Sequence, residues 1–370
     1  MQGQKPTLLL IARNYPPLTG GIEHLMQATL ESLVERYDVL LLGPTGCRQY
    51  AGAAKRVVEL PTGALLFLLL GLLMAPLLGV RHRPEWVLTS NGLMAPLGHL
   101  AAFTSGARKM GFLHGLDLTT SNRVYRTLFL PLLRRIKTMV VNSSNTRRLA
   151  IDRGLQPEFV HVIHPCIREP AAAVAPSTPL QPGYLLYAGR IIPRKGLLEF
   201  IQANSNWLIE NDMQLVIAGD SPRGSVEGSR GKYAAQLRSA CIDKGIEERV
   251  HFLGVVSDGE LAWCFQHAGL HIMPLVEIAG DVEGFGMVVV EAASHGTATV
   301  AFNCGGVGDA IADPSCLVKP GDYAELRHVI TKQLNTPPDK QVLRAWAAGF
   351  YRPAYQQKLN ALMTMPRENL

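Results

Sequence analysis

Short apolar runs without charge recur along the whole chain, and they constrain its fold more than any other feature. Thr7–Ala12, Trp86–Thr89 and Leu215–Ala218 are typical, and each is followed within two residues by Gly, Asn or Ser. Apolar runs of this length, separated by segments of helical periodicity, indicate parallel strands that helices cover on both faces. We therefore expect an α/β protein built from doubly wound parallel sheets.

The length and one shift in composition predict two domains. A chain of 370 residues exceeds one ordinary core, and Glu169–Pro182 is rich in Ala, Pro, Ser and Thr, as an interdomain linker would be. The expected domains are residues 1–172 and 183–350, and a polar stretch through Arg230 is expected to form a surface loop. The other expected strands are Val39–Leu42, Met110–Leu113, Met139–Asn142, Val160–Ile163, Tyr184–Ala188, Val250–Leu253, Leu270–Met273, Thr299–Phe302 and Leu317–Val318.

The charge and cysteine content restrict the partners and the compartment. A formal charge of +6 suits an anionic partner, which could be a nucleotide diphosphate, an acidic lipid headgroup or a nucleic acid. No known nucleic-acid module accompanies the charge, so nucleic acid is the least favoured of the three. The 6 cysteines are scattered without metal-binding spacing, and the first residues do not resemble a signal peptide. We expect a cytoplasmic protein with reduced thiols.

Leu60–Val80 contains no charged residue and is long enough to be a membrane-span candidate. However, Gly71 and Pro76 interrupt it, and the strands expected at Val39–Leu42 and Trp86–Thr89 lie on either side. A spanning helix would place these two strands of one domain on opposite sides of a bilayer. We expect a helix within the N-terminal domain, part of which could contact lipid because an all-apolar helix must be covered.

Arg123–Lys137 mixes basic and large apolar residues in a helix that Pro131 is expected to break. One interpretation is an element that binds the anionic surface of a membrane. The other is a helix packed on the core with a solvated basic face. The sequence does not decide between the two.

Glu283–Glu291, with the sequence EGFGMVVVE, is expected to be a loop that opens a helix at about Phe285. A helix start offers unpaired N–H groups to an anion or a sugar, and the two glycines allow close approach of a ligand. Glu283 would lie before the helix and Glu291 about two turns inside it, which suits a long ligand held at two points. The alternative is a capped core helix with an incidental acid.

This stretch resembles the E-x7-E signature of the retaining nucleotide-sugar glycosyltransferases of family 4. The longer run Asp281–Gly306 is similar to mannosyltransferases of the phosphatidylinositol mannoside type. The resemblance implies the GT-B fold, with two Rossmann-like domains facing a cleft and a C-terminal helix, residues 351–370, that returns to the first domain. It also implies that Glu283 contacts the transferred sugar and that Glu291 binds the ribose. Further donor contacts are then expected from Gly284, Phe285, Gly286, Met287 and Val288.

Gly189–Gly196 resembles the family's GR-x4-KG motif and places Arg190 and Lys195 on the donor diphosphate. Cleavage of a sugar-phosphate bond leaves negative charge on the diphosphate, and fixed cations stabilise that charge. These two residues would replace a metal, so no metal or other cofactor is expected. The alternative is a solvated basic turn.

Two segments of the N-terminal domain complete the resemblance. Gly20 and Gly21 form a strand-to-helix turn that would lie near the donor phosphates, although an ordinary turn has the same pattern. His114 and Asp117 match an HG-x-[DE] motif whose His lies beside the transferred sugar; Asp117 is assigned to the acceptor. A histidine at the end of a strand can also be purely structural.

The predicted function is a retaining, metal-independent hexosyltransferase. It would use GDP-mannose or a UDP-sugar and a lipid-linked or saccharide acceptor, in synthesis of cell-envelope glycans such as lipopolysaccharide or of glycolipids, at the inner face of the cytoplasmic membrane. A sugar-nucleotide epimerase of the same architecture is the alternative. A dinucleotide-dependent oxidoreductase is disfavoured because no G-x-G-x-x-G follows Thr7–Ala12, and a non-catalytic membrane protein because the motif residues are intact.

Overall fold

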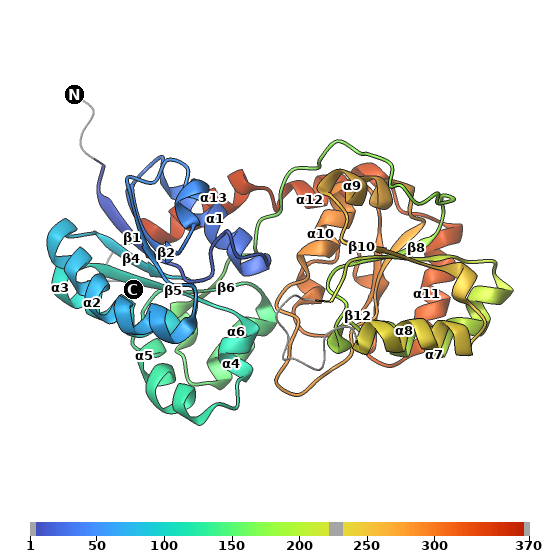
Figure 1. Ribbon diagram of the computed structural model, residues 1–370, viewed down its shortest axis with the longest axis horizontal. Helices are drawn as coiled ribbons and strands as arrows, with labels where there is room; N and C mark the ends of the chain where they lie inside the picture. The colour runs from blue at the N-terminus through green and yellow to red at the C-terminus, as the bar shows by residue number, and fades with distance from the viewer. Residues whose placement is uncertain (1–4, 222–231, 366–370) are drawn as a thin grey trace. The chain divides into compact units, whose positions relative to one another are not determined.

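The computed structural model describes residues 5–221 and 232–365, and it divides into two compact units (Figure 1). The first unit comprises Met1–Cys166 and Arg352–Leu370, and the second comprises Ile167–Tyr351. The Ala- and Pro-rich segment 169–182 therefore belongs to the second unit. The surface loop expected through Arg230 lies outside the described residues after Ser221.

The first unit contains a seven-stranded sheet in the order β3-β2-β1-β4-β5-β6-β7, in which neighbouring strands are parallel. Its strands are β1 (Thr7–Ile11), β2 (Asp38–Pro44), β3 (Arg56–Leu60), β4 (Trp86–Thr89), β5 (Arg108–Leu113), β6 (Met139–Val141) and β7 (Val160–Val162). Its helices are α1 (Gly21–Leu33), α2 (Ala64–His82), α3 (Ala95–Ser105), α4 (Gly115–Thr119), α5 (Leu130–Leu133), α6 (Ser144–Asp152) and α13 (Arg352–Met363), with short turns η1 (Cys47–Tyr50), η2 (Gly92–Met94), η3 (Tyr125–Phe129) and η4 (Pro157–Phe159).

The alternation of side chains along β1 builds two separate cores, one on each face of the sheet. Leu8 and Leu10 pack with residues of α1 and α13. Leu9 and Ile11 point to the opposite face and pack with residues of α2 and α3. A strand buried on both faces must be apolar throughout, which explains the continuous run in the sequence.

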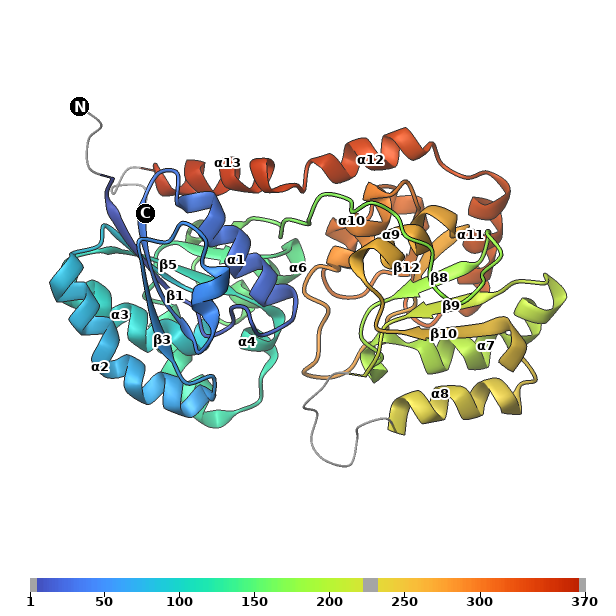
Figure 2. The ribbon, with the colours of Figure 1, turned by 45° about the horizontal axis from the view of Figure 1, so that its top comes forward.

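The last helix, α13, packs against α1 as expected for the returning helix of the GT-B fold (Figure 2). The hydroxyl groups of Thr29 and Tyr355 share a buried hydrogen bond of 2.7 Å. At the surface, Arg352 forms an ion pair of 2.9 Å with Glu31. The prediction that the C-terminal helix contacts the first domain is confirmed.

The charge-free run at Leu60–Val80 forms most of α2, which is long and apolar enough to cross a membrane by length and composition. The strands before and after α2, β3 and β4, belong to the same sheet, so the helix is part of the first unit, as predicted. Its small residues face the protein: a Cβ on Gly71 would meet Leu97, and one on Gly79 would meet the backbone of Ala101. Most of its leucines face outward, and Leu73 is 72% exposed, whereas Leu78 is buried.

The basic segment at Arg123–Lys137 becomes the π-helical turn η3 followed by α5, with Pro131 in the first turn of α5. Leu130 and Leu133 are buried in the core, whereas Arg135 is exposed. This arrangement agrees with a core-packed element that has a solvated basic side.

The second unit contains a six-stranded parallel sheet in the order β10-β9-β8-β11-β12-β13. Its strands are β8 (Leu185–Ala188), β9 (Leu215–Ala218), β10 (Val250–Gly254), β11 (Leu270–Met273), β12 (Thr299–Phe302) and β13 (Leu317–Val318). Its helices are α7 (Leu197–Glu210), α8 (Lys232–Asp243), α9 (Asp258–His267), α10 (Met287–Ser294), α11 (Tyr323–Asn335) and α12 (Lys340–Ala348), with short turns η5 (Pro193–Lys195), η6 (Glu247–Arg249), η7 (Val307–Asp309) and η8 (Pro314–Cys316).

Helices cover both faces of the second sheet as well. Leu185 and Tyr187 of β8 point into the larger core, while Leu186 and Ala188 point into the smaller one beside α9. All cysteines of the chain are buried and free of disulfides. Both units are thus doubly wound, as the sequence predicts.

Candidate active site

The strand order of the second sheet reverses between β8 and β11, and ligands of doubly wound sheets bind beyond the carboxyl ends of strands at such a point. The GR-x4-KG segment follows β8, and the loop that leads to α10 follows β11. The two segments touch: Gly196 has φ 69°, and a Cβ there would overlap the carbonyl oxygen of Pro274. Glycine is therefore required for the two loops to meet.

Helix α10 begins at Met287, two residues later than predicted, because Gly286 before it has φ 88°. Phe285 is only 2% exposed, and its ring lies 5.7 Å from that of Phe350, so its side chain belongs to the core and not to a ligand surface. Glu291 therefore lies little more than one turn inside the helix, and the predicted two turns were wrong.

Four charged side chains meet at the mouth of this helix, and three of them are buried. Oε2 of Glu283 accepts hydrogen bonds from Nζ of Lys195, at 2.8 Å, and from the guanidinium of Arg194. Nε of Arg194 donates to Oδ1 of Asp281 at 2.9 Å. The side chains of Arg194, Lys195 and Glu283 are 6%, 9% and 13% exposed, so this cluster is nearly removed from water.

Burial and pairing act in opposite directions on these groups. Burial alone would raise the pKa of Glu283, but the charges of Lys195 and Arg194 and their hydrogen bonds lower it to about 2. Burial also opposes the charge of Arg194, and the two carboxylates outweigh it and raise its pKa. Burial lowers the pKa of Lys195, and the charge and hydrogen bond of Glu283 act against this effect. Glu283 and Arg194 are therefore ionised at neutral pH. Two fixed cations at a helix start form a site suited to an anion.

The main chain of Glu283 is held by the glycine pair that follows β12. The N–H of Gly306 donates to the carbonyl oxygen of Glu283 at 2.8 Å. A Cβ on Gly305, where φ is 64°, would overlap the same oxygen. This contact fixes the loop before α10, and it explains why the motif resemblance extends as far as Gly306.

Glu291 differs from Glu283 in having no hydrogen bond to its carboxylate among the described residues. Burial raises its pKa to about 7, and the charge of Asp258 adds to this effect, against Arg168 and Lys195. A half-buried carboxylate with a strongly raised pKa and free acceptor atoms is a typical feature of a functional site.

Within the GR-x4-KG segment, the buried cations are Arg194 and Lys195, whereas the motif pointed to Arg190 and Lys195. Arg190 is exposed, and its carbonyl oxygen accepts a hydrogen bond of 2.6 Å from the hydroxyl of Tyr187. Arg194 was not singled out from the sequence, although it lies inside the motif and is the buried cation nearest to Lys195 in the chain. Asp281, its second partner, was missed in the same way.

In the first unit, His114 and Asp117 lie at the carboxyl end of β5 and the start of α4. Nε2 of His114 is 3.0 Å from the carbonyl oxygen of Ser90. Oδ2 of Asp117 accepts from the N–H of His114 at 3.0 Å, while Oδ1 accepts from the N–H of Gly92 at 3.1 Å and from the hydroxyl of Tyr125 at 3.2 Å. The carboxylate of Asp117 therefore organises this turn, and its role toward an acceptor stays a prediction.

The turn at Gly20 and Gly21 leads into α1 as predicted, and an acid already lies beside it. Glu23 in the first turn is buried, and a Cβ on Gly20 would overlap its carboxylate. Nδ2 of Asn14 donates to the other oxygen of Glu23 at 2.7 Å. A phosphate at this helix start would meet a negative charge, so a role of Gly20 and Gly21 toward phosphate stays a prediction.

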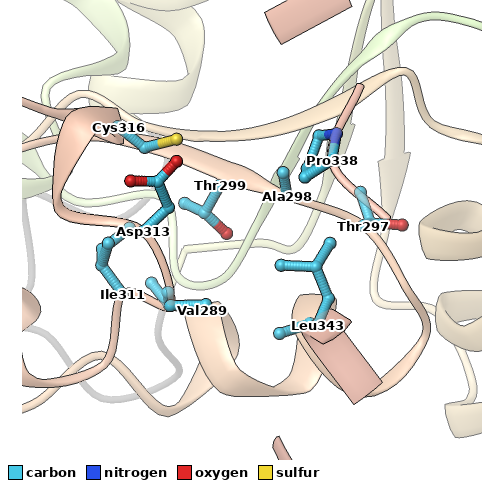
Figure 3. A pocket seen from close by; sticks show the side chains of 11 residues that line it. Val289, Thr297, Ala298, Thr299, Ile311, Asp313, Cys316, Pro338 and Leu343 are labelled. Carbon is cyan, nitrogen blue, oxygen red and sulfur yellow. The ribbon is translucent and has the colours of Figure 1, made fainter. Parts of the chain in front are cut away.

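A small apolar cavity in the second unit is a separate feature (Figure 3). It lies beneath α10 between Val289, Ile311 and Leu343 and holds about 20 Å³. This volume accommodates about one water molecule and excludes a sugar nucleotide. Among the described residues, no group of three or more His, Cys, Asp or Glu side chains could hold a metal ion.

Comparison with known proteins places both units in one class. The model of glycosyl transferases group 1 matches residues 172–348, and that of glycosyltransferase family 4 matches residues 19–169. Among solved structures, Alr3699/HepE from Anabaena in complex with UDP has a TM-score of 0.76 and 18% identity, covering 97% of this chain and 99% of that one. The fold is therefore GT-B.

Curated relatives agree with this class. The GDP-mannose-dependent alpha-(1-6)-phosphatidylinositol monomannoside mannosyltransferase of Mycolicibacterium smegmatis is 27% identical over 336 residues, 83% of each chain. The lipopolysaccharide 1,2-N-acetylglucosaminetransferase of Salmonella typhimurium is 33% identical over 35% of this chain and 32% of its own length. The MMP alpha-(1->4)-mannosyltransferase of Mycolicibacterium hassiacum is 27% identical over 54% of this chain and 45% of its own length. The chain thus spans less than half of these last two relatives. It belongs to the family 4 glycosyltransferases of group 1.

Proposed function

We propose that the chain is a retaining glycosyltransferase that moves a hexose from a nucleotide-diphosphate sugar bound by the second unit. The observation that carries this proposal is the pair of carboxylates at α10, Glu283 in the loop before the helix and Glu291 within it. Glu283 is hydrogen-bonded to two buried cations at the mouth of the helix. Glu291 lies little more than one turn inside α10, and its carboxylate accepts no hydrogen bond from the residues that the structure describes. The first environment suits a sugar beside a diphosphate, and the second suits ribose hydroxyl groups.

The proposed reaction follows from the charges of this cluster. The bond between the anomeric carbon and the diphosphate oxygen breaks, and its electron pair stays on the diphosphate. The acceptor hydroxyl then forms the new bond on the same face of the sugar, and its proton passes to the leaving oxygen. Lys195 and Arg194 are already fixed and desolvated, so they stabilise the added negative charge without reorganisation. Arg190 is exposed and can reach the diphosphate from the solvent side.

The donor is proposed to be GDP-mannose or a UDP-sugar. HepE was solved in complex with UDP-glucose, whereas the relative from M. smegmatis is described as GDP-mannose-dependent. A thermal-shift screen against guanosine, uridine and adenosine diphosphates and their sugars tests this choice, since a ligand raises apparent stability by mass action. Stabilisation by guanosine or uridine compounds is expected; a response to adenosine compounds alone would contradict it. Sugar epimerised in the absence of an acceptor would favour an epimerase instead.

The acceptor is proposed to be a lipid-linked or saccharide substrate of cell-envelope synthesis, met at the inner face of the cytoplasmic membrane. The support comes from the outward-facing leucines of α2, which form an exposed apolar surface larger than isolated surface residues would make. Those exposed are Leu65, Leu66, Leu69, Leu70, Leu72, Leu73, Leu77 and Val80.

Vesicle flotation tests the membrane association. The protein is expected to float with vesicles that contain phosphatidylglycerol at low salt and to be released by an alkaline wash. If the protein does not float with these vesicles, the proposed membrane association is wrong. Resistance to both salt and alkaline washing would show that α2 crosses the bilayer.

A further inference from the structure

The pocket between α3, the start of β5 and α5 combines an apolar rim with basic groups that have no carboxylate partner among the described residues. It has a volume of about 540 Å³ and is lined in part by His99, Leu100, Phe103, Lys109, Leu132 and Arg135. It lies at the amino end of β5, whereas His114 follows the carboxyl end of that strand. The pocket is therefore separate from the predicted catalytic residues of the first unit.

One wall of the pocket is a fixed polar arrangement. Nζ of Lys109 lies 3.0 Å from Nδ1 of His99, and Nε2 of His99 lies 2.9 Å from the carbonyl oxygen of Leu132. Because an ammonium group can only donate, Nδ1 accepts and Nε2 donates its proton to Leu132. His99 is therefore neutral and orients Lys109. Burial lowers the pKa of His99, and the charges of Lys109 and Arg135 act in the same direction.

The pocket has positive charge without a counter-charge. Burial lowers the pKa of Lys109, and the nearby Arg135 lowers it further. Neither residue forms an ion pair with a carboxylate among the described residues. Two cations that repel each other in a partly buried pocket gain free energy when an anion binds between them.

Apolar surface connects this pocket with α2. On α3, Thr104 faces α2 and donates its hydroxyl to the carbonyl oxygen of Pro76 at 3.2 Å. At 100° per residue, Leu100 and Phe103 lie on the solvent side of α3, where they line the pocket next to the side that packs on α2. Phe103 is 88% exposed. Helices α2 and α3 lie side by side in both ribbon views (Figures 1 and 2), so their exposed apolar residues form one surface.

We propose that this pocket binds the phosphate of an anionic phospholipid headgroup, while Phe103 and the outward leucines of α2 enter the acyl region of the same leaflet. The proposal rests on the membrane association proposed above and names its lipid contact. A bilayer supplies both the anion and the apolar medium that the surface requires. A second copy of this chain is a less suitable partner, because each copy has a net charge of +6. In a two-fold contact, Lys109 and Arg135 of one copy would face the same positive residues of the other copy and be repelled.

The test uses wild-type protein, Arg135→Glu, Lys109→Gln and the control Lys244→Glu, which makes the same charge change as Arg135→Glu at an exposed site of the second unit. Binding is measured to vesicles of phosphatidylcholine with and without phosphatidylglycerol. Each basic residue near an anionic membrane contributes roughly fivefold in affinity, so Arg135→Glu should weaken binding to the anionic vesicles about 30-fold. Lys109→Gln should weaken it about fivefold, and Lys244→Glu should leave it within about twofold. Equal losses in Arg135→Glu and Lys244→Glu would overturn the proposal, since the attraction would then be diffuse.

A second measurement separates the lipid from a free phosphate. Titrations with monomeric dihexanoyl phosphatidylglycerol, glycerol 3-phosphate and inorganic phosphate are compared for wild type and Arg135→Glu. Binding of the short-chain lipid alone, lost in Arg135→Glu, is expected; equal affinity for glycerol 3-phosphate would overturn the lipid assignment. The affinity for nucleoside diphosphate is measured on the same samples and should not change in any variant. If the wild-type protein does not bind nucleoside diphosphate, the proposed function is contradicted. The conclusion about lipid binding is not affected by that outcome.

Discussion

The two units depart from the usual distribution of side chains in opposite directions. The second unit buries charge: Arg194, Lys195 and Glu283 are almost inaccessible to water. The first unit exposes apolar surface: most leucines of α2 point away from the protein, and its glycines face the core. Buried charge costs desolvation, and exposed leucine forgoes burial of about 1.5 to 3 kcal/mol per side chain.

At each of these two places a proposed ligand would offset the cost. An anionic donor would gain from cations that are already dehydrated, and a lipid leaflet would cover the leucines. Elsewhere both units follow ordinary rules, with continuous apolar strands and helices on both faces. We therefore propose that the buried charges and the exposed leucines mark the two binding regions of the chain. The following experiments test each side of this comparison, starting with the largest expected effect.

Of the substitutions considered below, Glu283→Ala should have the largest effect, which is a loss of stability of the second unit. Removal of this carboxylate leaves Arg194 and Lys195 buried with less counter-charge, which typically costs about 3 to 5 kcal/mol. Urea unfolding, followed by a probe of the second unit, measures the effect. The matched control is Glu31→Ala, which breaks the partly exposed pair with Arg352 and should cost at most about 1 kcal/mol. Similar losses in both variants would mean that burial of the cluster has no energetic consequence.

Arg190→Ala and Lys195→Ala should each reduce turnover more than donor affinity. Loss of a fixed donor to a developing negative charge, as in Lys195→Ala, costs about 2.7 to 4 kcal/mol, or roughly a hundred- to a thousandfold in rate. The exposed Arg190 is not fixed in the same way, so its loss should cost less. Because both act on one diphosphate, the double variant should lose less than the sum. Single-turnover transfer at saturating donor measures this. If the single variants transfer sugar at the wild-type rate, both residues only bind the donor and do not accelerate the reaction.

Donor affinity should depend on pH through Glu291. Its pKa of about 7 lies above the ordinary value, so the carboxylate is mostly protonated below neutral pH and loses its capacity as an ionised acceptor. Between about pH 8 and about pH 6, the affinity for a nucleotide sugar should fall up to about tenfold. A nucleotide sugar is the correct probe because its diphosphate has no terminal phosphate to titrate in this range. Glu291→Gln should give a flat profile; a slope that persists there would assign the effect to another group.

Leu73→Ser should change stability least, because the residue contributes little to the core. A change within about 0.5 kcal/mol is expected, as for other surface substitutions. The matched control is Ile242→Ser on α8, an exposed apolar residue of the second unit. Flotation with anionic vesicles should weaken for Leu73→Ser and stay unchanged for Ile242→Ser. Stability losses above about 2 kcal/mol in Leu73→Ser would show that α2 is packed in the free protein.

The sequence predicted the fold well because buried parallel strands carry a continuous signal. β4, β9, β11, β12 and β13 have the predicted bounds. The strand β3 was missed because Arg56 and Glu59 interrupt its apolar pattern, which an edge strand of the sheet tolerates. The start of α10 was placed two residues early because apolarity does not reveal that Gly286 adopts a left-handed conformation.

The candidate site was predicted less completely, since spacing along the chain does not show which charges meet. The motif pointed to Glu283, Glu291, Arg190 and Lys195. It did not show that Arg194 as well as Lys195 is bonded to Glu283, because these contacts join loops after two different strands. Likewise, periodicity could not tell which face of α2 is exposed, since nearly all of its residues are apolar.

Isothermal titration of nucleoside diphosphate into wild type, Glu291→Ala and Glu283→Ala tests the central claim most directly. Glu291→Ala should weaken binding by about 1.5 to 3 kcal/mol, because the ribose hydroxyls lose a charged acceptor. Glu283→Ala should change it less, since that residue is assigned to the sugar. Unchanged affinity in Glu291→Ala would contradict the assignment of α10 as the nucleotide site.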